Sequence, residues 1–466
     1  MGSVEHASGL PDQPFSNYEQ VYLNMSRAFS HLKKEHWGIH VICEIKHDAP
    51  PGTGTVKAIS SAWTRLAAEF PGLRMVPVGR EKHFPAMDET AWLDRTFFTS
   101  SNLASQDVIA QAKPRNHPSL YYLPTTSEVI LLTQHWRSDG LGACMLLDRL
   151  FQILATNPTG PVRPNPPSPS LESAAGASSS SDPSLQSYAR TYIDNFHARA
   201  VHAGGLPFQG DTATPPSLAS RMDLDLSAGA TSSLVSACKS QGISVTAAIH
   251  SALAQTVFSY LPSEEEKRAG YTTVMAVNMR PFLPAPYNSA SHACQTFVAS
   301  ITPTVAYRRD DGPGPGSGSA SSFLDSAKSL THEYRTWHSG DKDMFMRSLH
   351  WIYQYHVEKL SAPPPPGAVR KPPSGVTLSS LGVVDNYLKG RYEGDGGAGG
   401  KGVEVGKFRF GVSMMTRQTI LYAWTFRGKL TLSLSYNAAY YEESMVKEVL
   451  NRVKRGMEVG LGLELE

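Results

Sequence analysis

The chain has 466 residues, of which 41% are hydrophobic and 18% are charged, a composition typical of a folded globular protein. Its length exceeds the size at which one hydrophobic core usually stops growing, so we expect two domains or lobes. The 43 basic and 41 acidic residues give a formal charge of +2, which offers no support for nucleic-acid binding.

The cysteines and the N-terminus indicate where the protein works. Four cysteines lie far apart with no CxxC pair, a pattern typical of buried thiols in a reducing compartment; they are Cys43, Cys144, Cys238 and Cys294. Residues 1–10 lack the basic and apolar parts of a secretory signal, and no apolar run is long enough to span a bilayer. The sequence therefore predicts a cytoplasmic protein without a membrane partner. Because the histidines show no metal-ligand spacing, we expect no metal site.

The first third of the chain alternates between helical and strand-like patterns. In chain order, these predict a helix over 18–32, a strand over 37–45, a helix over 55–70, a strand over 73–78, a hairpin formed by 120–123 and 128–133, and a helix from 139 onward. In the first helix, the apolar face is expected at Val21, Tyr22, Met25 and Phe29.

A stretch rich in Pro, Ser, Gly and Ala over 158–183 has almost nothing to bury, so we expect a linker or exposed crossover there. It sets the predicted boundary between an N-terminal lobe, 1–183, and a C-terminal lobe, 184–466. The second lobe is predicted to contain helices at 185–199, 227–240, 244–261, 323–337, 344–360 and 442–457, and strands at 218–226, 271–277, 296–301, 376–384, 403–414, 419–426 and 430–436.

One histidine, His135, stands where a strand meets a helix. It follows the apolar run 129–132 and precedes Asp139 and Gly140, which are expected to start the helix, with Gly140 allowing a tight turn. Such junctions place a side chain at the rim of a sheet, where a substrate can reach it. A neutral imidazole there can take a proton from an alcohol or amine that attacks an acyl carbonyl. A histidine after a strand is more often structural, so the residues around it decide the interpretation.

Those residues form the pattern HxxxDG, from His135 to Gly140, and here the chain resembles the CoA-dependent acyltransferase superfamily. The group includes chloramphenicol acetyltransferase, plant BAHD acyltransferases, condensation domains of nonribosomal peptide synthetases and fungal trichothecene-type O-acetyltransferases. The resemblance continues at Asn278-Met279-Arg280, at Ser379 to Gly382 and at the closing strand and helix from Gly428, so it spans roughly residues 18–453.

The resemblance implies an α/β (α+β) fold of two chloramphenicol-acetyltransferase-like lobes, each a mixed β-sheet flanked by helices, with an active-site tunnel between them. It implies that His135 is the catalytic base and that Asp139 pairs with Arg280, while Gly140 and Asn278 support the site. Ser379, Ser380 and Trp424 are candidates for contacting the substrate or the tetrahedral oxyanion. The resemblance also implies that no cofactor is bound, that acyl-CoA is a co-substrate and that the acceptor is a small-molecule alcohol. The protein is expected to be a monomer.

Three departures from patterns in the wider superfamily narrow the expected reaction. Gln134 stands where peptide-forming condensation domains usually carry a second histidine, and no carrier-protein-like segment is evident. The Asp-Phe-Gly-Trp-Gly block of plant enzymes is also absent. We therefore expect an O-acyltransferase that moves an acyl, first of all an acetyl, group to a hydroxyl of a secondary metabolite. The alternatives are condensation-type transfer from a carrier-protein thioester and a relative that binds ligand without catalysis.

Overall fold

The computed structural model describes residues 10–47, 53–200, 204–211, 213–308, 320–338, 341–363, 374–394 and 402–466. Its contacts divide the chain into two compact units. The first contains Met1–Gly176, Met279–Val298 and Val384–Val412, and the second contains Ala177–Asn278, Ala299–Val383 and Ser413–Glu466. This division differs from a single boundary at residue 183, because two later segments return to pack with the N-terminal residues.

The first unit contains a six-stranded sheet with the order β14-β15-β2-β7-β6-β5. Its strands are β14 (Arg391–Tyr392), β15 (Val403–Val412), β2 (Ile39–His47), β7 (Glu128–Thr133), β6 (Ser119–Leu123) and β5 (Phe97–Thr99). The predicted hairpin is present as β6 and β7, with Leu123 opposite Glu128. Strand β15 pairs antiparallel with β2 from Ile39 to His47, so a strand from late in the sequence completes the N-terminal sheet.

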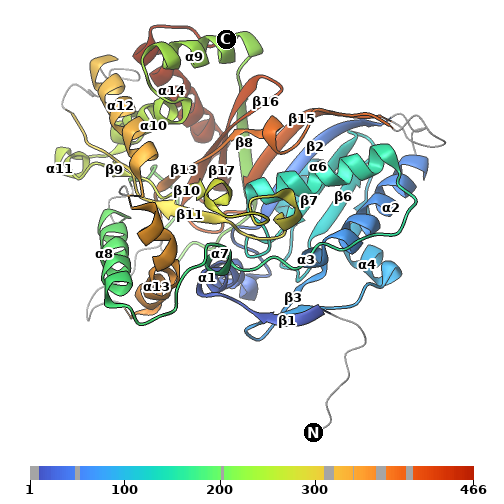
Figure 1. Cartoon of the computed structure of the whole chain (residues 1–466). Helices are drawn as coiled ribbons and strands as arrows, with labels where there is room; N and C mark the ends of the chain where they lie inside the picture. Colours follow the sequence, from blue (N-terminus) through green and yellow to red (C-terminus); the bar gives the residue numbers. More distant parts are fainter. Residues whose placement is uncertain are drawn as a thin grey trace. The chain divides into compact units, whose positions relative to one another are not determined.

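Helices pack on this sheet in Figure 1, with α6 (Gly140–Thr156) against β2, β7 and β15, and α2 (Thr53–Glu69) against α6. The first unit also contains α1 (Asn17–Arg27), α3 (Pro71–Arg74), α4 (Glu89–Thr96), α5 (Ser105–Ala110), α7 (Leu171–Ala174) and a three-stranded sheet with the order β1-β4-β3: β1 (Leu10–Pro14), β4 (Glu81–Phe84) and β3 (Val76–Val78). Sequence periodicity does not indicate the short elements β1, β4, β5, α4 and α5.

Two predictions for this unit are wrong in detail. Helix α1 buries Tyr18, Glu19, Tyr22, Leu23 and Ser26, so of the face expected from its apolar residues only Tyr22 is buried, and Val21, Met25 and Phe29 are half-buried. The strand predicted over 73–78 is reduced to β3 at Val76–Val78. A proline at the first helical position has its φ angle preset for a helix, and α3 therefore occupies Pro71–Arg74.

The second unit contains a four-stranded sheet with the order β13-β16-β17-β8: β13 (Val376–Val383), β16 (Thr419–Phe426), β17 (Lys429–Asn437) and β8 (Ala219–Asp225). The predicted hairpin of β16 and β17 turns at Arg427 and Gly428, which both have positive φ, as a two-residue type I′ turn requires. Helices α9 (Ala228–Ser240), α10 (Val245–Tyr260), α12 (Ala320–Thr336) and α14 (Glu443–Leu461) pack around a core shared with this sheet. Ser244 caps α10 as expected.

The remaining elements of the second unit are α8 (Pro183–Ala200), which packs against α13 (Lys342–Ser361), the short helix α11 (Glu264–Arg268) and short strands. These strands are β9 (Tyr271–Thr272), which pairs with β12 (Thr304–Val305), and β10 (Met275–Asn278), which pairs with β11 (Val298–Ile301). The structure confirms the mixed α/β class, with several sheets flanked by helices.

The predicted linker is held in place over much of its length. Asn165 donates its backbone N–H to the Glu69 carbonyl over 2.8 Å, and α7 follows with Ser170 as its N-cap. Leu171 and Ala174 are each only 1% exposed. The crossover from α6 to α7 is thus a packed part of the first unit, which composition alone does not reveal.

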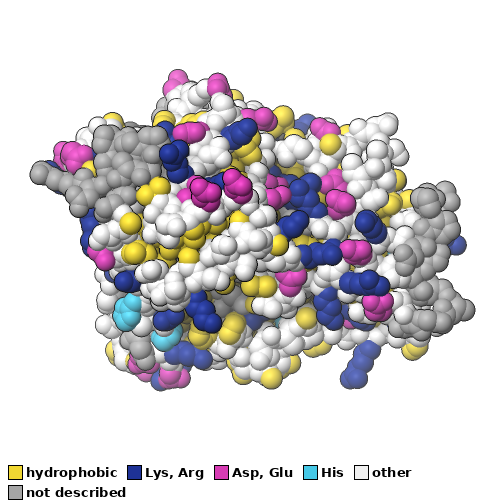
Figure 2. Space-filling view, turned by 90° about the horizontal axis from the view of Figure 1, so that it is seen from above, with side chains coloured by type: hydrophobic (Ala, Val, Ile, Leu, Met, Phe, Trp, Pro, Cys, Tyr) yellow, Lys and Arg dark blue, Asp and Glu magenta, His cyan; other side chains and the backbone are white. Residues whose placement is uncertain are grey.

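Charged side chains of both signs are interspersed on the face drawn in Figure 2, in keeping with the nearly balanced charge of the chain. Within the described residues, no helix combines the length and apolar character needed to cross a bilayer.

Candidate active site

The loop that carries His135 joins β7 to α6 inside the first unit. Residues 134–138 form a tight turn in which the backbone N–H groups of Arg137 and Ser138 both donate to the Gln134 carbonyl, over 2.9 and 3.2 Å. The backbone of His135 is fixed from outside this turn, because the Thr296 hydroxyl donates a hydrogen bond to the His135 carbonyl. The histidine is thus held at the end of a buried strand, as the sequence predicts.

Asp139 and Arg280 form the ion pair that the resemblance predicts. The Arg280 Nη1 atom lies 2.8 and 3.0 Å from the two carboxylate oxygens, and the side chains are 3% and 2% exposed. Asp139 also caps α6 by accepting the Gly142 N–H over 2.8 Å, and it accepts the Phe297 N–H over 2.8 Å. One carboxylate therefore ties together the helix start, the arginine and the segment that carries Thr296.

The close approach of this segment to α6 depends on Gly142 rather than Gly140. A Cβ atom on Gly142 would lie 2.4 Å from the Ala293 carbonyl oxygen and 2.4 Å from the Ser138 hydroxyl. The Ser138 hydroxyl donates to the same Ala293 carbonyl over 2.8 Å. Gly140 is the first residue of α6 and does not have a positive φ, so a left-handed backbone is not what requires glycine there.

Aromatic rings surround the imidazole of His135. The Tyr22 ring stacks on it with centroids 4.2 Å apart and an interplanar angle of 12°, and the Trp37 ring is tilted against it at 5.8 Å. Trp37 has a φ of 61°, an unusual conformation for a bulky residue and one that clusters at functional sites. Burial lowers the pKa of His135 to about 4, against smaller opposing effects of its own backbone and of Asp139. The imidazole is therefore neutral at pH 7, the form that accepts a proton.

Gln134 and Arg137 fasten the loop to neighbouring segments. The Arg137 side chain is fully buried and donates to the backbone carbonyls of Gly72, Leu73, Met75 and Asn116. Its Nε atom also donates to the Gln134 side-chain oxygen over 3.2 Å. The residue that replaces the second histidine of condensation domains thus orients a buried guanidinium.

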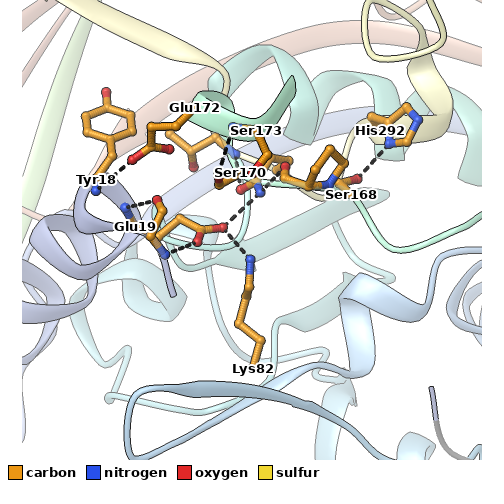
Figure 3. Close-up of polar contacts among 12 residues, drawn as sticks. Tyr18, Glu19, Lys82, Ser168, Ser170, Glu172, Ser173 and His292 are labelled. Atoms are coloured by element: carbon orange, nitrogen blue, oxygen red, sulfur yellow. Dashed lines mark hydrogen bonds and ion pairs between the residues drawn. The ribbon is translucent and has the colours of Figure 1, made fainter. Parts of the chain in front are cut away.

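A buried polar cluster supports the site from the side of α1 (Figure 3). The Lys82 Nζ atom lies 2.7 Å from the Glu19 Oε1 atom, and Gln295 donates to the same oxygen over 2.8 Å. Gln295 also donates to the Pro169 carbonyl over 2.6 Å and accepts the Thr296 N–H over 2.9 Å. Contacts therefore run from α1 and the crossover to the residue that fixes the His135 carbonyl.

The same cluster contains a second buried carboxyl, that of Glu172, which accepts the backbone N–H of Tyr18 over 3.4 Å (Figure 3). Burial raises the pKa of Glu172 to about 7, helped by the charge of Glu19 and opposed by hydrogen bonds. Nearby, the His292 Nδ1 atom lies 3.1 Å from the Ser168 hydroxyl.

The other predicted site residues belong to the second unit. Asn278 ends β10 and is half-buried. Ser379 and Ser380 lie on β13, and the Ser380 hydroxyl lies 3.1 Å from that of Thr246 on α10. Trp424 is 1% exposed on β16. Their roles in substrate or oxyanion binding stay predictions.

Several residues that shape the site have no signal in the sequence motif. The sequence places Tyr22 only on a helix face, and nothing in it reveals the left-handed conformation of Trp37 or the hydrogen bond from Thr296. Among the residues that the structure describes, no group of three or more His, Cys, Asp and Glu side chains could hold a metal ion.

No protein-family model matches the chain. It is 56% identical over 471 residues to azaphilone biosynthesis cluster protein M of Aspergillus terreus, covering all of this chain and 99% of that protein. It is 44% identical over 469 residues to O-acetyltransferase pigM of Monascus ruber, covering 98% of this chain and 87% of pigM.

The fold is shared with a solved structure, that of TRI3 trichothecene 15-O-acetyltransferase from Fusarium sporotrichioides, at a TM-score of 0.75 and 15% identity. The match covers 97% of this chain and 95% of that one. The two long, closely related sequences and the shared fold agree with the HxxxDG resemblance. The chain belongs to the family of O-acetyltransferase pigM, and it has the fold of the TRI3 acetyltransferase.

Proposed function

We propose that the protein transfers an acyl group, first of all acetyl, from acyl-CoA to a hydroxyl of a small secondary metabolite. The observation that carries this proposal is the half-buried, neutral imidazole of His135 on a loop fixed by the Asp139–Arg280 ion pair. The names of the relatives add support, since one is an O-acetyltransferase and another comes from an azaphilone biosynthesis cluster.

In the proposed reaction, His135 takes the proton of the acceptor hydroxyl as its oxygen attacks the thioester carbonyl carbon. The tetrahedral intermediate collapses, the carbon–sulfur bond breaks, and the imidazolium returns the proton to the departing CoA thiolate. The nearby Asp139 carboxylate favours the imidazolium, whereas burial disfavours it. The proton therefore stays on His135 only while the intermediate exists.

Replacement of His135 by Ala tests this role. General-base catalysis contributes about 10²- to 10⁴-fold in rate, so His135→Ala should lower kcat/KM for acyl-CoA and an alcohol acceptor by that factor. Its melting temperature should stay close to that of the unchanged protein. His83→Ala is a matched control, because His83 lies in the same unit and pairs with Asp12 at the surface. Undiminished acyl transfer by His135→Ala would overturn the proposal.

A panel of donors tests the alternatives. Acyl-CoA thioesters of increasing chain length are compared with the same acyl groups on a carrier protein, and products are identified by mass spectrometry. Transfer from carrier-bound thioesters alone would favour condensation-type chemistry. Tight binding of acceptors without any product from either donor class would favour a ligand-binding relative. We expect product from a CoA thioester.

The monomeric state and the cytoplasmic location belong to the same proposal. All four cysteines are buried free thiols, which suits a reducing compartment. Light scattering on the purified protein should give one chain mass of about 50.7 kDa. Imaging of the tagged protein in its host tests the location.

A further inference from the structure

The ring of His135 is held differently from its backbone. The Thr296 hydroxyl fixes the carbonyl, but the Nδ1 atom is buried and makes no hydrogen bond to another residue that the structure describes. Catalytic histidines are commonly oriented by a carboxylate or carbonyl that accepts from this nitrogen. Rotation about the last side-chain bond of a histidine has only broad energy minima, so another contact must define the ring plane.

Tyr22 provides that contact. Its ring lies nearly parallel to the imidazole, at 12° and 4.2 Å between centroids, and a parallel neighbour at this distance restricts rotation of the imidazole out of its plane. The Trp37 ring lies 5.8 Å from the imidazole and 6.0 Å from the Tyr22 ring. The three rings form one group inside the first unit.

Helix α1 presents Tyr22 from a fixed position. The Ser16 side chain and Glu19 form a capping box at its start, and the Glu19 carboxylate is also bound by Lys82 and Gln295. The Tyr22 hydroxyl lies 2.9 Å from the Tyr18 hydroxyl one turn earlier. The helix that carries the stacking ring is thus anchored by the cluster in Figure 3, which also leads to Thr296.

We propose that Tyr22 is a positioning residue for acyl transfer: its ring, rather than a hydrogen bond from Nδ1 to another residue, fixes the plane in which the His135 imidazole receives the proton. The proposal rests on the function proposed above for His135. The planar ring of Tyr22 is the part that positions the imidazole, and its hydroxyl only bonds that of Tyr18 one turn earlier on α1.

Two substitutions separate the ring from the hydroxyl. Tyr22→Phe keeps the ring and should retain kcat within about 3-fold. Tyr22→Leu keeps an apolar side chain but removes the planar face, and it should lower kcat by about 10- to 100-fold, since small misplacements of a catalytic group have effects of that order. KM for acyl-CoA should change little in both. Equal loss in both variants, or an unchanged kcat in Tyr22→Leu, would overturn the proposal.

Coupling to His135 separates positioning from general loss of structure. In a His135→Ala background, the further change Tyr22→Leu should not lower the residual rate, because no imidazole remains to be oriented. A further 10-fold drop there would contradict the proposal. If His135→Ala itself keeps full activity, the proposed function fails instead, so the two failures are distinguishable.

A matched control lies in the second unit, where the Tyr334 ring is parallel to that of His250 at 11° and 6.4 Å. Tyr334→Leu makes the same chemical change beside another buried histidine and should leave kcat unchanged. In protein with ¹³C-labelled histidine, Tyr22→Leu should remove the ring-current shift of the His135 resonance, while Tyr22→Phe and Tyr334→Leu should retain it. A His135 resonance that is insensitive to Tyr22→Leu would refute the stacking.

Discussion

Replacement of Asp139 by Asn removes one charge from the buried ion pair while keeping the shape of the side chain. Removing one partner of such a pair costs about 3–5 kcal/mol, because the Arg280 guanidinium is left buried without a counter-charge. The amide oxygen can still accept the Gly142 N–H, but the amide nitrogen replaces the oxygen that accepts the Phe297 N–H, so the cost combines the lost charge with one lost buried hydrogen bond. For a folding unit of 150–250 residues, about 2–4 °C is lost per kcal/mol, so the melting temperature should fall by about 6–20 °C.

The assay compares melting temperatures of three variants with that of the unchanged protein. Asp139→Asn combined with Arg280→Gln removes both charges and should recover at least about half of the loss. Glu393→Gln is the matched control, because its ion pair with Arg391 is 74% and 73% exposed and surface pairs contribute about 0–1 kcal/mol. If Asp139→Asn melts within about 2 °C of the unchanged protein, or the double variant is less stable than the single one, the reasoning is refuted.

Two further predictions concern the surroundings of this ion pair. Burial raises the pKa of Glu172 from 4.5 to about 7, so the folded protein favours the protonated carboxyl. The contribution of this group to the free energy of unfolding should be greatest below pH 4.5 and should fall by about 3 kcal/mol as the pH rises through 7. The melting temperature of Glu172→Gln, measured between pH 4.5 and 8, should rise relative to that of the unchanged protein up to pH 7. If the two melting temperatures change in parallel with pH, the prediction is contradicted. Gly142→Ala forces a Cβ against the Ala293 carbonyl and the Ser138 hydroxyl and should lower the free energy of unfolding, measured by urea denaturation, by about 1–3 kcal/mol. Gly54→Ala in α2, with open space around it, should cost nothing or stabilise slightly, and equal effects of the two would argue against the close approach.

Much of the fold can be predicted because its long elements have strong periodicity. The hairpin before His135, helix α6 and the β16–β17 hairpin all bury apolar stripes that a single sequence displays. Short elements such as α3 and β4 depend on tertiary contacts, so their local pattern is weak. The pairing of β15 with β2 in the N-terminal sheet could not be predicted either, because the sequence of a strand does not show which distant strand it pairs with.

The candidate site also contains residues that the sequence predicts and residues that it does not. His135, Asp139 and Arg280 are recognisable because a motif preserves the residue types, and the structure confirms the ion pair. Tyr22 and Thr296 contact His135 through side-chain geometry, at sequence separations of more than one hundred residues. A tyrosine on a helix and a threonine before a strand are common in any protein, so nothing marks these two as neighbours of the histidine.

The crossover after α6 has a consequence for how the chain can be cut. Its composition resembles that of a tether, a natural place to nick the protein or to split it into two co-expressed fragments. Yet Leu171 and Ala174 are buried, and Gln295 donates to the Pro169 carbonyl while also contacting Glu19. A protease would have to open this packing before it could bind the chain, so the native protein should resist cleavage there. Fragments divided at this point would each lack part of the support for His135.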